Sequence, residues 1–156
     1  MLFRSSAGVL RLASASAAGS GALVANSPGT VDVVSDVGIA ALSGNGAVTL
    51  AGGATLTTTT DSGLSSSFNG VVSGGGALTK AGAGALSLSA AQTYSGATTV
   101  AAGRLTLGIG ASLSSPSISI AGGSLLTSAN GQLGSAAPAL TVDGSVALAE
   151  IGRAHV

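Results

Sequence analysis

The sequence predicts an all-β fold made of stacked coils of about 20 residues each, and three observations support this prediction. Small residues dominate, since Ala, Gly, Ser and Thr make up 95 of the 156 residues, whereas charged residues make up 6%. Leu, Val and Ile alternate with small or polar residues, which is the period of a strand with one buried face. These short segments recur along the chain, each directly after a glycine. One such unit cannot bury its apolar face alone, so we expect each coil to cover the next.

The repeated pattern is Gly-x-(Leu/Val)-x-(Leu/Val). Clear copies occupy residues 8–12, 29–33, 46–50, 84–88, 103–107 and 144–148, and a degenerate copy occupies 123–126. The spacing of the leading glycines is about 20 residues, except between the third and fourth copies, where it is nearly double. We therefore expect a decayed copy in residues 61–68, where Gly63 and Leu64 preserve part of the pattern.

Additional strands are expected between the copies, at residues 117–120 and 140–142, because both segments alternate polar and apolar side chains. The glycine before each copy indicates a turn, as do the pairs Asn45–Gly46 and Asn69–Gly70. Asn-Gly could also close antiparallel hairpins, which leaves a second topology open. The recurring length of the unit favours stacked coils over hairpins.

Residues 76–107 contain an ordered set of motifs. They read Gly-Ala-Leu-Thr-Lys at 76–80, Gly-Ala-Leu-Ser-Leu at 84–88, Thr-Tyr-Ser-Gly at 93–96, Thr-Thr-Val at 98–100 and Gly-Arg-Leu-Thr-Leu at 103–107. In this order they resemble the autotransporter-associated β-strand repeat of type V secreted bacterial proteins, with the closest similarity over residues 68–108. Gln92 departs from the family pattern, which usually has Asn before Thr-Tyr, and Ala77 and Ala85 stand where Thr is common.

The resemblance implies a right-handed parallel β-helix, and we expect passenger repeats of this kind over residues 1–149. It implies export through a C-terminal outer-membrane β-barrel, and a location at the bacterial cell surface, in the outer membrane or outside the cell. The expected role is structural, as a stalk or adhesin scaffold, and its partners are neighbouring coils, that barrel and an unknown host-cell or matrix ligand. We expect this chain to contain passenger only.

No enzymatic site is predicted, and we expect no catalytic, cofactor-binding or metal-binding residues and no cofactor. Asp32 and Asp36 are too far apart along one strand to act as a catalytic pair and are interpreted as solvated, with a calcium contact as the alternative. The low charge excludes a nucleic-acid interface. Two other functions remain open: a β-helix whose polysaccharide-degrading site lies outside this segment, or a Gly/Ala/Ser-rich segment that self-associates.

A few side chains invite a more specific interpretation. Tyr94 is expected to pack at a corner, and Phe68 to cap or fill an irregular coil. Lys80 is expected to be a solvated turn residue, with a positively charged edge as the alternative. The run of threonines at 57–60 raises an ice-binding alternative, which requires threonines in register on several coils. Thr79 and Thr99 supply weak counterparts, and the next coil supplies none.

The last seven residues, 150–156, differ in composition from the rest of the chain, which is rich in small residues, and they contain His155, the only histidine. One back-translation of residues 151–156, ATC GGA AGA GCA CAC GTC, resembles a sequencing adapter. We therefore expect this segment to be a non-native tail that carries no function. At the other end, residues 1–15 lack the clean apolar run of a signal peptide, because Arg11 interrupts it.

Overall fold

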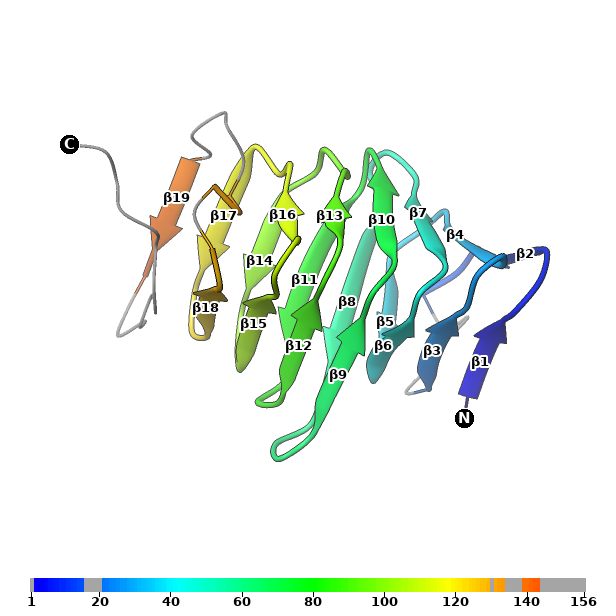
Figure 1. Ribbon diagram of the computed structural model, residues 1–156, viewed down its shortest axis with the longest axis horizontal. Helices are drawn as coiled ribbons and strands as arrows, with labels where there is room; N and C mark the ends of the chain where they lie inside the picture. Colours follow the sequence, from blue (N-terminus) through cyan, green and yellow to red (C-terminus); the bar gives the residue numbers. More distant parts are fainter. Residues whose placement is uncertain (1, 16–20, 130, 134–138, 144–156) are drawn as a thin grey trace.

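The computed structural model describes residues 2–15, 21–129, 131–133 and 139–143, and these form a β-solenoid of about six turns with ~20-residue coils. Figure 1 shows the coils side by side along the long axis of the molecule, with β1 and β19 at opposite ends. All the strand pairs between described residues are parallel. The predicted all-β solenoid is therefore confirmed, and the hairpin alternative is wrong for these strands.

The strands form three long faces. The seven-stranded sheet contains β1 (Leu2–Ser5), β3 (Ala22–Ala25), β6 (Ala41–Gly44), β9 (Ser65–Phe68), β12 (Ala85–Leu88), β15 (Arg104–Leu107) and β18 (Ser124–Thr127). The six-stranded sheet contains β5 (Val37–Ile39), β8 (Thr55–Thr59), β11 (Ala77–Ala81), β14 (Thr98–Val100), β17 (Ser117–Ile120) and β19 (Ala139–Val142). The third face begins with β2 (Val9–Leu12), β4 (Thr30–Val33), β7 (Ala47–Leu50) and β10 (Val71–Gly74), and a two-stranded sheet of β13 (Ala91–Gln92) and β16 (Ser112–Leu113) follows.

The core consists of apolar columns that run along the solenoid axis. In the seven-stranded sheet, Leu86 pairs with Leu105 and Leu105 pairs with Leu125, and all three are buried. Successive residues of a strand point to opposite sides of the sheet. The residues that alternate with these leucines along each strand therefore face outward. Each coil thereby covers the apolar face of its neighbour, as the alternating pattern predicts. Phe68, which was expected to fill an irregular coil, is fully buried beside Leu88 in this sheet.

The glycine-led copies lie on two faces of the solenoid, although the sequence suggested one equivalent series. The first three copies supply β2, β4 and β7, whereas the copies at 84–88, 103–107 and 123–126 supply β12, β15 and β18 of the seven-stranded sheet. The change from the four-stranded to the seven-stranded sheet occurs between the third copy, at 46–50, and the fourth, at 84–88. A strand is present there, since β9 aligns Ser66 and Phe68 with Leu86 and Leu88. The Gly63–Leu64 pair is not the preserved part of the pattern, however, because it precedes β9 and Leu64 is exposed.

The expected strands at 117–120 and 140–142 are both present, as β17 and β19 of the six-stranded sheet. The copy at 144–148 and the tail at 150–156 lie outside the described residues. The part of the chain that the structure describes contains no helix long and apolar enough to span a membrane.

Among the described residues, three buried hydroxyls have no hydrogen-bond partner, those of Ser35, Thr58 and Thr127, and the one at Thr58 lies deepest in the ladder. Thr58 is fully buried on β8 between Ile39 and Lys80 in the ladder, and its Oγ1 is unpaired. We expect Thr58→Val, which keeps the shape and removes the hydroxyl, to raise the free energy of unfolding by about 1 kcal/mol. Urea denaturation measures this change, and Thr57→Val on the outer face of the same strand is the control, with no gain expected. An equal gain at both positions would contradict the buried-hydroxyl explanation.

Candidate functional site

The acidic residues do not converge on a site. Asp32 lies on β4 of one face, whereas Asp36 precedes β5 of another, where its Oδ1 accepts a hydrogen bond of 2.8 Å from the amide of Thr55. Asp36 therefore caps a neighbouring strand. Within the described ranges, no three His, Cys, Asp or Glu side chains lie close enough to hold a metal ion. The predicted tail residue His155 lies outside those ranges.

Lys80 is inside the solenoid, and the expectation that it is a solvated turn residue is wrong. It is fully buried on β11, facing the same side as Leu78. Its Nζ donates hydrogen bonds to the carbonyl oxygens of Ala81 at 2.5 Å, Gly82 at 2.8 Å and, on the next coil, Ala102 at 3.5 Å. Burial lowers the pKa of the Lys80 ammonium below its ordinary value, because the charged form is poorly solvated there.

Gln92 hydrogen-bonds backbone groups of the coil of β10, at the point where the four-stranded sheet ends and the two-stranded sheet of β13 and β16 begins. Its side chain is fully buried, and Oε1 accepts a 2.7 Å bond from the amide of Val72 on the preceding coil. Nε2 donates to the carbonyls of Gly70, at 3.2 Å, and Ala90, at 2.6 Å. Gln92, which departs from the family pattern, therefore uses its side-chain amide to replace hydrogen bonds that a neighbouring strand would otherwise make.

Gln132 has a similar role two coils after Gln92. Its Oε1 accepts from the amides of Ser128 and Ala129, and its Nε2 donates to the carbonyl of Gly108 at 2.6 Å. Glutamine amides thus recur on this face, at a corner where the ladder of the four-stranded sheet has ended. We infer that their role is structural, since the groups they bind are backbone groups.

Tyr94 packs inside the solenoid as predicted. It is fully buried, and its hydroxyl lies 2.6 Å from Oγ1 of Thr98, which is also buried. Burial raises the pKa of Tyr94 to about 12, while the hydrogen bond to Thr98 acts in the opposite direction. The phenol is therefore part of the core and is not available to a ligand.

This shifted pKa predicts a loss of stability in strong alkali. The folded pKa lies above the ordinary value of 10.0, so the contribution is intact below pH 10 and is lost as the pH rises toward 12. The full loss is about 2–3 kcal/mol, from about 1.4 kcal/mol for each unit of pKa difference. Urea unfolding between pH 9 and pH 12 should show this decline in the unchanged protein relative to Tyr94→Phe, which has no ionisable phenol. Parallel curves for the two proteins would contradict the prediction.

The outer face of the six-stranded sheet carries a column of hydroxyls. Thr57, Thr79, Thr99, Ser119 and Thr141 are paired in register on five successive strands. The sequence had suggested that the column stops after Thr99, but Ser119 continues it on the next coil. The adjacent outward column is not hydroxylated throughout, because Ala77 follows Thr55. The register required by the ice-binding alternative is thus met in one column, and that function remains a prediction.

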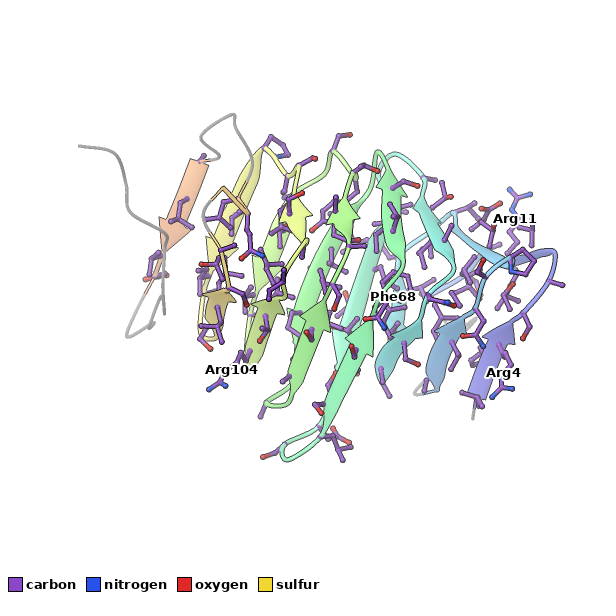
Figure 2. All side chains as sticks on the ribbon, in the orientation of Figure 1. Arg4, Arg11, Phe68 and Arg104 are labelled. Carbon is purple, nitrogen blue, oxygen red and sulfur yellow. The ribbon has the colours of Figure 1, made fainter. Side chains whose placement is uncertain are left out.

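A surface hollow lies beside the turn between β8 and β9. Figure 1 shows the connection between β8 and β9 reaching further out than the neighbouring corners, and Leu64 in it is 61% exposed. The hollow, of about 470 Å³, has a floor of small residues and includes Arg104 and Ser124. Figure 2 shows the Arg104 side chain directed away from the solenoid. The lining of the hollow therefore includes one cationic side chain, that of Arg104, and otherwise consists largely of glycine and alanine.

Comparison with known families supports the structural interpretation. Residues 78–107 match the family described as the passenger-associated-transport-repeat. The match begins within β11 and ends with β15, so it spans the coil of β11, β12 and β13 and the first two strands of the next coil, β14 and β15. No match to the chain was found among curated proteins or among solved structures.

The matched segment contains the buried groups described above. Lys80, Gln92 and the Tyr94–Thr98 pair all lie within it, and each makes hydrogen bonds inside the core or between coils. The predicted resemblance is confirmed: the chain is a β-solenoid that carries a passenger-associated-transport-repeat, and it fits the passenger region of an autotransporter.

Proposed function

We propose that this solenoid is a stiff spacer, a stalk that holds another part of an autotransporter passenger away from the bacterial surface. The observation that carries the proposal is the parallel register from β1 to β18, in which each strand of the seven-stranded sheet pairs with the next. A stack in which each coil contacts its neighbours over its whole cross-section resists bending more than beads joined by linkers do.

The outer surface supports a spacer more than a ligand-binding domain. Outward positions on the six-stranded sheet are occupied by small uncharged residues, such as Ala77, Thr79 and Ser119. Protein interfaces are enriched in aromatic residues and arginine. Here Phe68 and Tyr94 are buried, so they cannot anchor a partner. In this proposal any adhesive or polysaccharide-degrading activity belongs to other parts of the passenger, and this chain itself is not an enzyme.

The proposal includes display at the cell surface or in the extracellular medium, with a C-terminal outer-membrane β-barrel as the export partner and a host-cell or matrix ligand contacted elsewhere in the passenger. Support for this location comes from the family of the matched repeat, whose members are associated with passenger transport.

Surface display tests the spacer. The chain is placed between an N-terminal epitope and an outer-membrane anchor in a bacterium, and antibody binding to intact cells is measured before and after protease treatment. We expect the epitope to be accessible and the solenoid to resist the protease. An epitope that stays inaccessible, or a solenoid that is degraded at once, would overturn the proposal.

Experiments on the purified chain distinguish the spacer from a self-associating segment and from an adhesin. A monomer with cooperative unfolding is expected, whereas a random-coil monomer that gains β-structure only on association supports the self-associating segment. Beads coated with the chain should not adhere to fibronectin or collagen. Saturable adhesion that is lost in Arg104→Gln would instead assign the chain an adhesive role.

A further inference from the structure

Lys80 is the only lysine of the chain, and the folded solenoid encloses its amine. Nζ is directed at carbonyl oxygens from two successive coils, those of Ala81 and Gly82 at its own corner and that of Ala102 at the next. These three acceptors match the three N–H donors of an ammonium group. The amine is therefore both shielded from solvent and fully engaged.

The neighbours of Lys80 provide no alternative charge partner. In the ladder it lies between Thr58 and Val100, and the column continues to Ile120. The strands that pack against β11 are β8 and β14, and neither contains an acidic residue. The hydrogen-bond partners of the Lys80 ammonium are therefore backbone carbonyl oxygens, and the strands that pair with β11 supply no carboxylate.

Acylation would remove what this arrangement depends on. An N-acyl lysine is neutral and has one N–H in place of three, so at least two of the carbonyls would lose their donor. The added acyl group also needs volume in a core that is packed with Leu, Val and Ile, where extra atoms force side chains or backbone to move. Both effects act on the contact between the coil of β11 and the coil of β14.

We propose that Lys80 is a modification site that is open only before the solenoid folds, and that acylation there prevents the two coils from stacking. The co-reactant is an activated acyl donor, an acyl phosphate or a thioester. The unprotonated Nζ attacks the acyl carbon, the bond from that carbon to the phosphate oxygen or sulfur breaks, and the nitrogen releases a proton. The product is an amide at Lys80 and free phosphate or thiol. This inference does not depend on the proposed spacer function.

The order of two treatments of the full-length chain tests the proposal. In one sample the folded chain is treated with N-hydroxysuccinimidyl acetate, then unfolded in urea and refolded. In the other sample the chain is unfolded first, acetylated in urea and then refolded. The first sample should acquire acetate at the N-terminal amine only and regain its original urea midpoint. The second, acetylated at Lys80, should fail to regain its circular dichroism and protease resistance.

A matched exposed amine provides the control. Arg104→Lys adds a second lysine on the outward face of β15, so both amines can be followed in one sample by peptide mass spectrometry. We expect Lys80 of the folded variant to react at least about a hundredfold more slowly than the added amine, because it must wait for local opening. Equal rates at the two positions would overturn the proposal. Recovery of the original urea midpoint by a chain acetylated at Lys80 would overturn it as well.

Discussion

We expect Gln92→Leu to lower the free energy of unfolding by about 3 kcal/mol, one of the two largest effects among the substitutions considered. Leucine has a similar volume and fits an apolar core, so packing changes little. The amide of Val72 and the carbonyl of Gly70 lose their partners while they remain buried. A buried backbone group without a partner costs about 1–3 kcal/mol. Urea unfolding followed by circular dichroism measures the change, provided that the slope of the transition stays constant.

Two variants separate lost hydrogen bonds from other effects of the substitution. Thr93→Val changes an exposed neighbour, and its effect should stay within about 0.5 kcal/mol. Gln92→Glu retains the acceptor for Val72 but places a carboxylate against two carbonyl oxygens, so protonation of the new side chain should restore stability at low pH. A Gln92→Leu protein as stable as the unchanged one would show that water satisfies these backbone groups.

The fold could be predicted because its main determinant is local. Period-two alternation, a glycine before each copy and a unit of nearly constant length all follow from one coil being copied many times. The same simplicity concealed which face each copy occupies. The four-stranded and the seven-stranded sheet both contain glycine-led copies with two inward apolar residues, so the copy at 46–50 and the copy at 84–88 read alike although they lie on different sheets.

The buried polar groups were harder to predict, for reasons that differ between residues. Lys80 follows Leu78 at a spacing of two, so the alternation that identified the strand already indicated that both side chains face inward. The general rule that lysine side chains are solvated predicts the opposite, and the structure follows the alternation. Gln92 could not be predicted in this way, because its role depends on the sheet ending at β10, which is a property of the stacked coils.

The largest effect is expected at Gly103, where Gly103→Ala should lower the free energy of unfolding by about 4 kcal/mol or more. Its backbone has a φ of +69°, in the left-handed region that costs an L-residue about 1–2 kcal/mol. In addition, a Cβ at this position would lie 2.2 Å from the carbonyl oxygen of Gly84 and 2.4 Å from that of Gly82. Both contacts are with backbone of the preceding coil, so the two coils must move apart. Urea unfolding of the variant measures the loss.

Gly53→Ala separates the two causes. Gly53 also has a positive φ, of +84°, but no atom lies within 4 Å of the position that its Cβ would take. Its substitution should therefore cost only the conformational term, about 1–2 kcal/mol. The difference between the two variants measures what close approach of the coils contributes at the corner before β15. Equal losses would mean that the coils can separate there at little cost, and the tight corner would then not be what holds the matched repeat against its neighbour.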